Sequence, residues 1–349
     1  MATTTSSARN FQAGLVSILM PTYNSIVFLD SRIQSIQSQV YKSFEVIVID
    51  GYSEDGTWTQ LQSVARSDPR WILRQRKPEG VYAALNEAMS SARGEYIYFA
   101  MSDDTCDAYL LQTAVAEMKE KKHVDIVQFS VAVIDERGGL LYDTRFFGDF
   151  ADFFGSSACV CHERSLAGDL KRQAVMTSLY LSLTGIFVRA TLVEKAGLFP
   201  VSMSEIADVV WTSRLCAYGN SLIYVPRPYA TWRRHKRQIT ANKSRNELAK
   251  AYISKLNAIR SLFPEDKHSL LNVLTQRAEN SIILRTGSFI FRPHLWCFFA
   301  ETIFYKLQMF LARLTGGKAA VQRVRGSKMR RYASSEDIHF FSGQDYHHN

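Results

Sequence analysis

Two adjacent carboxylates carry the clearest chemical signal in this 349-residue chain. Asp103 and Asp104 lie just beyond a largely apolar run, 95–100. Neighbouring carboxylates repel each other unless a cation offsets their charge. Their oxygen atoms suit Mg²⁺ or Mn²⁺, and such an ion commonly bridges the phosphates of a substrate. The pair predicts a metal–phosphate site or, as the alternative, an Asp-rich turn that caps the next helix.

Two other strand-like segments also end in polar residues. The segment 44–49 leads into Asp50 and a glycine-containing turn, and the segment 15–20 leads into residues 21–24, Pro-Thr-Tyr-Asn. Glycine lets a backbone approach a nucleobase or ribose closely, whereas a tyrosine and an asparagine offer stacking and hydrogen bonding. For the turn that follows Asp50, a plain strand–helix connection with a capping residue is the alternative. Three polar strand ends on one edge of a sheet favour a nucleotide site.

The elements that must position these residues are predicted from the spacing of apolar side chains. Short strands alternate with amphipathic helices, which is typical of a parallel sheet with right-handed crossovers in an α/β sandwich. In such sheets ligands bind beyond the carboxyl ends of the strands. The predicted strands are 15–20, 44–49, 71–74, 95–100, 124–129 and 183–187, and the predicted helices are 25–39, 57–66, 81–92, 108–121 and 191–196.

Residues 15–110 resemble the donor-binding half of family 2 glycosyltransferases. Four motifs carry the resemblance in the family's order and spacing, namely 16–24, 48–57, 80–86 and 92–104. The resemblance implies the GT-A fold, a Rossmann-like α/β sandwich. It also implies transfer of one sugar, with inversion, from a nucleotide sugar to a hydroxyl acceptor. A UDP-sugar is the first expectation for the donor, and Mg²⁺ or Mn²⁺ for the cofactor.

The resemblance assigns a role to each matched residue. Asp104 is expected to bind the metal, Asp103 to face the ribose, and Asp50 to hydrogen-bond the base. The whole nucleotide-sugar set implied in this way is Pro21, Thr22, Tyr23, Asn24, Asp50, Asn86, Asp103 and His235. The family often has acids where Pro78 and Ala83 stand here, so the resemblance implies no donor-sugar contact at that turn.

A second block predicts the catalytic base. Residues 183–199 resemble the family segment that precedes its catalytic acid, and Asp208 follows at the head of a predicted helix. A sugar hydroxyl is a weak nucleophile, so a carboxylate must accept its proton during attack. Asp208 is the predicted base and Glu205 the second choice, whereas a simple helix N-cap is the alternative role for Asp208.

A basic run, 233–237, comes shortly after Asp208. By the same resemblance, His235 is expected to close over the diphosphate, where positive charge assists departure of the leaving group. A solvated basic turn is the alternative. The Gln-x-x-Arg-Trp motif of processive polysaccharide synthases does not follow, which favours transfer of a single sugar.

Charge is distributed unevenly along the chain. The net charge of +9 combines +17 over residues 227–331 with −5 before them and −3 after them. Such a division predicts separate partners, and an anionic membrane surface and nucleic acid are the two candidates. The aromatic, amphipathic stretch 289–314 favours the membrane, although its charged residues argue against a spanning helix. A helix packed on the catalytic domain is the alternative for this stretch. The expected acceptor is therefore a glycan or lipid-linked glycan of surface polysaccharide synthesis.

The same features suggest an organisation and a compartment. We expect a disordered tail at 1–11, a catalytic domain at 12–240, a mainly helical basic extension at 241–320 and a loose tail at 321–349. Five scattered cysteines and an N-terminus without signal-like character favour the cytoplasm, with the inner face of the cell membrane as a possible site.

Two other classes of function compete with sugar transfer. A nucleotidyltransferase that makes activated sugars usually has a glycine-rich basic loop after its first strand, and Pro-Thr-Tyr-Asn stands there instead. A non-catalytic module that binds sugar or RNA has no need of Asp103, Asp104 and Asp208 together. Both alternatives predict no metal-dependent sugar transfer.

Overall fold

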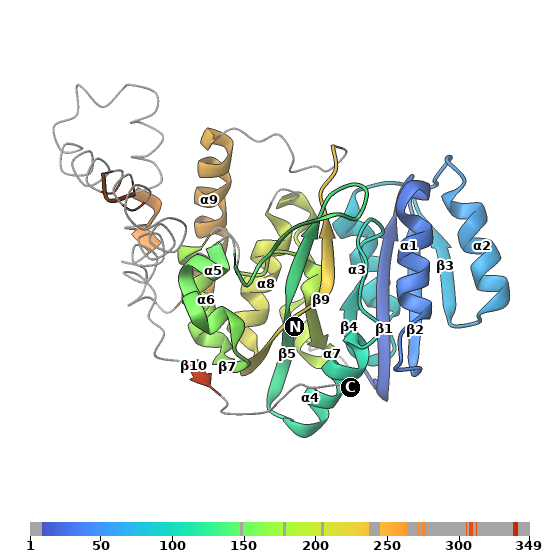
Figure 1. Ribbon diagram of the computed structural model, residues 1–349, viewed down its shortest axis with the longest axis horizontal. Helices are drawn as coiled ribbons and strands as arrows, with labels where there is room; N and C mark the ends of the chain where they lie inside the picture. The colour runs from blue at the N-terminus through green and yellow to red at the C-terminus, as the bar shows by residue number, and fades with distance from the viewer. Residues whose placement is uncertain are drawn as a thin grey trace, which may run out of the picture.

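The computed structural model describes residues 9–146, 149–176, 179–203, 206–236, 245–263 and 338–340, with shorter pieces between 265 and 312. One mixed sheet runs across this part of the chain, from β3 at one end to β7 and β10 at the other (Figure 1). Its strand order is β10-β7-β9-β5-β8-β4-β1-β2-β3, and β6 pairs antiparallel with β5 outside this order.

The first half of the sheet is parallel, as the sequence predicts. Each strand is followed by a helix, and the ends of most elements lie within three residues of the predicted ones. The strands are β1 (Gln12–Thr22), β2 (Phe44–Asp50), β3 (Trp71–Gln75) and β4 (Gly94–Phe99), and the helices are α1 (Ile26–Gln37), α2 (Thr57–Ser67), α3 (Val81–Ser91) and α4 (Leu110–Glu120).

The second half of the sheet is mixed. The strand β8 (Ile186–Arg189) runs antiparallel between β4 and β5 (Val124–Ile134), and β9 (Ser221–Arg233) runs parallel to β5. The predicted strand 183–187 starts three residues late, because 183–185 form a 3₁₀ turn. The remaining elements of this half are β6 (Leu140–Asp143), α5 (Asp149–Phe154), β7 (His162–Ser165), α6 (Leu166–Val175), α7 (Ala190–Ala196) and α8 (Ala207–Tyr218).

Helices cover both faces of the sheet and create two hydrophobic cores. On β2, Val46 and Val48 pack with α1 and α4, whereas Ile47 and Ile49 pack on the opposite face with α3. Successive side chains of a strand point to opposite faces, so a strand covered on both sides must be apolar throughout. The second core also contains Trp211 of α8, which links that helix to the centre of the sheet.

The helix α9 (Arg245–Ile259) belongs to this second core. Leu256 and Ile259 are fully buried and lie in the same cluster as the apolar side chains of α6 and α8. Lys255 is also buried, and its Nζ donates to the main-chain oxygens of Gln173 (2.8 Å) and Met176 (2.6 Å). Hydrophobic packing therefore continues past residue 240, where the sequence analysis ended the catalytic domain.

The amphipathic stretch 289–314 falls almost entirely outside the described residues. The strand β10 (Ile338–Phe340), which follows it in the chain, pairs antiparallel with β7. Among the helices that the structure describes, none combines the length and the apolar character needed to cross a membrane.

The packing of α9 predicts a large loss of stability when Leu256 is truncated. Leu256→Ala removes a fully buried side chain, and such changes lower the free energy of unfolding by about 2–5 kcal/mol. Urea denaturation of the full chain measures this loss, with the exposed neighbour Asn257→Ala as the matched control. Equal midpoints for the two variants would show that α9 contributes nothing to the core.

Candidate functional site

The predicted polar strand ends meet at one edge of the sheet. Thr22 lies opposite Asp50 on the neighbouring strand, and Asp50 lies opposite Gln75. The strand β4 runs parallel to β1 on its other side, so the acidic pair beyond β4 comes to the same edge. A parallel arrangement brings these carboxyl ends together, as the sequence analysis expected.

The Asp50 carboxylate is fully buried and builds the turn that follows it. Ser53 donates to it from both its amide (3.0 Å) and its hydroxyl (2.5 Å), and Gln75 donates from Nε2 (3.0 Å). Three of its acceptor positions are therefore occupied within the protein. A direct contact between Asp50 and a base remains a prediction.

Tyr23 is the most accessible residue of the predicted base pocket. Its side chain is 57% exposed, whereas Pro21 and Thr22 are buried. A Cβ atom at Gly51 would lie 2.9 Å from Cδ2 of Tyr23, so glycine is required for this close approach. Asn24 adopts a left-handed backbone (φ 48°) and accepts a hydrogen bond at Oδ1 from the Glu54 amide (3.0 Å). The two turns thus support each other and leave the Tyr23 ring open for stacking.

Asp55 accepts hydrogen bonds from the first amides of two helices, although the N-cap of α2 is Gly56 and the N-cap of α1 is Ser25. Its carboxylate accepts from the amide of Thr57 (3.1 Å) and from the amide of Ile26 (3.1 Å), at the first residues of α2 and α1. The capping interpretation does not hold for the acidic pair. The helix α4 begins at Leu110, and the carboxylate that serves this turn is Asp107, which accepts from the amide of Tyr109 (2.8 Å).

The two acids of the pair have different environments. Asp104 is 1% exposed, and its Oδ1 accepts a hydrogen bond from the amide of Arg233 (2.8 Å). Burial and the nearby Asp103 carboxylate raise the pKa of Asp104 to about 8. The Asp103 side chain is 27% exposed, and its Oδ2 lies 2.9 Å from Nε2 of His235. Asp103 is therefore the carboxylate that an incoming ligand can reach.

The end of β9 holds this acidic turn in place. Arg233 donates from Nε to the main-chain oxygen of Asp103 (2.7 Å) and from Nη1 to the main-chain oxygen of Glu136 (3.1 Å). The Phe28 ring packs 5.0 Å from the His235 ring and lies 5.0 Å from the Arg233 guanidinium carbon. The structure thus places His235 against Asp103, a contact that the sequence analysis did not predict. The roles of Arg233 and Phe28 were missed, because nothing local in the sequence pairs either residue with the acids.

Asp208 lies in the first turn of α8, close to its predicted place. The N-cap position is taken by Ile206, so Asp208 is not the N-cap. The Tyr82 hydroxyl forms a hydrogen bond with the Asp208 carboxylate. Burial, the Asp208 charge and this hydrogen bond raise the pKa of Tyr82. Tyr82 belongs to the third family-like motif, but its contact with Asp208 was not predicted. Glu205, the second choice for the base, lies outside the described residues.

Aromatic stacking connects Asp208 to the acidic pair. Trp211, one turn after Asp208, stacks on Phe199 with ring centroids 4.3 Å apart and meets Phe99 edge-on at 5.3 Å. Phe99 is the last residue of β4, the strand that leads into Asp103. The candidate base and the candidate metal site are thereby fixed to one rigid strand.

Asn86 makes two hydrogen bonds to the loop before α8. Its Nδ2 donates to the main-chain oxygen of Phe199 (3.0 Å), and its Oδ1 accepts from the amide of Phe199 (2.8 Å). Both contacts need a side-chain amide that donates and accepts, so Asn86 has a structural role at this position. A contact between Asn86 and the donor remains a prediction.

The donor set at the acidic turn fits a hard divalent cation. Within the described part of the chain, no group of three or more His, Cys, Asp or Glu side chains forms a complete metal site. Mg²⁺ commonly binds through one or two carboxylates, with the remaining ligands from water and substrate phosphates. One accessible carboxylate with a buried one beside it is compatible with that mode of binding.

The raised pKa of Asp104 predicts how stability depends on pH. A carboxyl group whose pKa is higher in the folded chain destabilises the fold as pH rises from about 3.9, the unfolded value, towards the folded value. Asp104→Asn keeps the acceptor for Arg233 and removes the charge. In EDTA, we expect this variant to melt at the same temperature as the wild type near pH 4 and at a higher temperature near pH 8. The exposed Asp30→Asn is the control, and a pH-independent difference would contradict the assigned shift.

The comparisons with known proteins agree with this geometry. Residues 17–167 match the family model described as Glycosyl transferase family 2. The GalNAc(5)-diNAcBac-PP-undecaprenol beta-1,3-glucosyltransferase of Campylobacter jejuni is 31% identical over 128 residues, which cover 36% of this chain and 40% of that protein. The chain spans less than half the length of this and other curated relatives.

Solved structures show the same fold. TarS 1–349 of S. aureus in complex with UDP-GlcNAc matches with a TM-score of 0.59 and 17% identity, over 96% of this chain and 99% of that chain. The mannosyltransferase PcManGT of Pyrobaculum calidifontis, in complex with GDP-Man and Mn²⁺, matches with a TM-score of 0.54 and 19% identity, over 90% of this chain and 86% of that chain. These likenesses confirm the GT-A fold that the sequence predicts. The segment 17–167 is therefore similar to glycosyl transferase family 2, and the fold around it is that of GT-A enzymes.

Proposed function

We propose that this protein transfers one sugar from a nucleotide sugar to a hydroxyl group of an acceptor, with inversion at the anomeric carbon. The observation that carries the proposal is the placement of Asp208 relative to Asp103 and Asp104. Trp211 packs α8 against the end of the strand that bears the acidic pair. A base and a phosphate-binding edge on the same scaffold are the two parts that such a transfer requires.

The proposed donor is a nucleotide sugar, with a UDP-sugar as the first choice. The exposed Tyr23 ring is the proposed stacking surface for the base, next to the turn that Asp50 builds. Two proteins of the same fold support this donor class, since their structures are complexes with UDP-GlcNAc and GDP-Man. Both nucleotide sugars are therefore the first probes to test.

For the metal, we propose Asp103 as the ligand in place of Asp104. The sequence analysis assigned this role to Asp104, but its carboxylate is buried and already accepts a hydrogen bond from Arg233. Asp103 is partly exposed, and its carboxylate lies 2.9 Å from Nε2 of His235. Bound there, Mg²⁺ or Mn²⁺ would offset the charge that develops on the departing diphosphate. His235 is the proposed protein cation over the same diphosphate.

Asp208 is the proposed base. Its carboxylate takes the proton of the acceptor hydroxyl while that oxygen attacks the anomeric carbon from the side opposite the diphosphate. Tyr82 donates a hydrogen bond to this carboxylate and so limits the directions in which it can point. The bond to the diphosphate breaks as the new glycosidic bond forms, and the configuration inverts.

The proposed acceptor is a glycan or a lipid-linked glycan, presented at the cytoplasmic face of a membrane. The net charge of +17 over 227–331 supports an anionic surface as partner. The Campylobacter relative supports this choice, since it is named as a glucosyltransferase for GalNAc(5)-diNAcBac-PP-undecaprenol. The stretch 289–314 lies largely outside the described residues, so membrane binding rests on the sequence.

Asp208→Asn tests the base. Asparagine keeps the shape of the side chain but accepts no proton, so transfer should fall by roughly 10²–10⁴. Donor affinity should stay near the wild-type value when UDP-GlcNAc and GDP-mannose binding are measured by calorimetry. A parallel collapse of donor affinity would place Asp208 in the donor site or in the structure, and Glu205 would then be the next variant. Absence of transfer with any donor would favour a nucleotidyltransferase or a binding module.

Asp103→Asn and Asp104→Asn together test the metal assignment. Binding of Mn²⁺ in the presence of UDP is followed by the loss of its free paramagnetic resonance signal. We expect Asp103→Asn to need at least about tenfold more Mn²⁺ for half-saturation, because a charged ligand is lost. Asp104→Asn should change this concentration much less. The reverse order would restore Asp104 as the ligand, and unchanged binding in both variants would reject a metal at this turn.

A further inference from the structure

A fully buried glutamine on α6 braces the turn that carries Asp208. Gln173 Nε2 donates to the Thr212 hydroxyl (3.0 Å) and to the main-chain oxygen of Val209 (3.4 Å), both on α8. Its Oε1 accepts from the amide of Leu179 (2.8 Å). One side chain thus joins the first turns of α8 to the segment around Leu179.

Thr212 completes the connection to the candidate base. Its hydroxyl donates to the main-chain oxygen of Asp208 (2.9 Å). The helix has no side-chain hydrogen bond at its N-cap, Ile206, although an N-cap side chain is the usual means of fixing a first turn. Hydrogen bonds from Gln173 to Val209 and Thr212 hold the first turns of α8 from the side instead.

Gln173 is itself held from two sides. Lys255 of α9 donates to its main-chain oxygen, which places a buried cation at the carboxyl end of α6. On the other side, Gln128 of β5 donates from Nε2 to the main-chain oxygen of Leu179 (3.3 Å). The brace therefore extends from the central sheet to α9.

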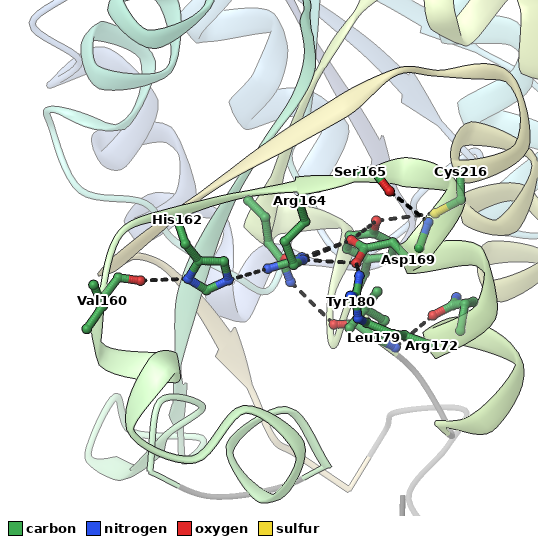
Figure 2. A network of polar contacts seen from close by, with 12 residues as sticks. Val160, His162, Arg164, Ser165, Asp169, Arg172, Leu179, Tyr180 and Cys216 are labelled. Atoms are coloured by element: carbon green, nitrogen blue, oxygen red, sulfur yellow. Dashed lines mark hydrogen bonds and ion pairs between the residues drawn. The ribbon is translucent and has the colours of Figure 1, made fainter. Parts of the chain in front are cut away.

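A buried ion cluster fixes the rest of α6. Figure 2 shows Arg164, Asp169 and Arg172 pointing toward one another, with the Tyr180 hydroxyl on the same carboxylate. Arg164 also donates from Nη2 to Oε1 of Gln128 (2.5 Å). Replacing such clusters by apolar residues is often neutral for stability, and their best-supported role is to select one arrangement of the chain. Here the selected arrangement is the one that aims Gln173 at α8.

We propose that Gln173 is a positioning residue for sugar transfer, holding the first turn of α8 so that Asp208 faces the acceptor hydroxyl. The inference rests on the proposed function, because it takes Asp208 as the base. Proton transfer requires the base within hydrogen-bonding distance of the attacking oxygen, and a displacement of about 1 Å can cost about a hundredfold in rate. Within the described residues, the hydrogen bonds of Gln173 to other segments go to α8, to α9 and to Leu179 and not to the donor edge, so donor affinity should not depend on it.

The test uses Gln173→Met and Thr212→Val in the full chain, with UDP-GlcNAc and GDP-mannose as donors. We expect kcat for transfer to fall about 10- to 100-fold in Gln173→Met and donor dissociation constants to change less than about threefold. Thr212→Val should cause a smaller loss of the same kind. The double variant should lose less than the product of the two single losses, because both residues act through one link. Tyr252→Phe is the matched control, since it removes a hydrogen bond to Ala174 (2.7 Å) at the same end of α6.

Hydrogen exchange supplies a second readout that needs no substrate. Amides of 206–215 should exchange at least about tenfold faster in Gln173→Met than in Tyr252→Phe, whereas those of α4 should be unchanged. Wild-type kcat with unchanged exchange would overturn the inference, as would equal losses of kcat and donor affinity. Asp208→Asn is measured alongside. If it is inactive while Gln173→Met is unimpaired, this inference alone fails; if it is fully active, the base assignment fails and this inference falls with it.

Discussion

The hydrogen bond from the Arg233 amide to the buried Asp104 carboxylate is the contact on which the site depends. It joins residues 129 positions apart and holds the end of β9 over the acidic turn. Because β9 pairs in parallel with β5, its end arrives at the same edge as the end of β4. His235 then meets Asp103, and one carboxylate of the pair stays open while the other is enclosed.

Burying the Asp104 carboxylate has an electrostatic cost. This cost is linked to the different environments of Asp104, which is buried, and Asp103, which is partly exposed. Two ionised carboxylates side by side are unfavourable, and burial of one of them adds a desolvation penalty. The rise in the pKa of Asp104 expresses both effects. A cation bound at Asp103, the proposed ligand, would relieve both effects, and the fold would then gain stability on binding it. Active sites often carry strain of this kind, and the surrounding sheet compensates for it.

The candidate base reaches the site by a different route. Asp208 lies on a helix that touches the donor half through aromatic rings and one tyrosine hydroxyl. Gln173 of α6 contacts the Asp208 main chain through the Thr212 hydroxyl. Lys255 of α9 in turn donates a hydrogen bond to the main-chain oxygen of Gln173. The basic C-terminal region therefore begins as part of the same hydrophobic core as α6 and α8.

The sequence alone determined the parts of this protein that depend on local pattern. Apolar runs that end in polar residues located the parallel strands, and parallel strands must bring Tyr23, Asp50 and the acidic pair to one edge. Only the tertiary structure decided which acid of the pair is open, since that depends on Arg233 from a strand far along the chain. The same holds for the brace from Gln173 and for the packing of α9. Periodicity encodes the face that a segment buries, but the register between distant segments is set by side-chain packing, which no local pattern contains.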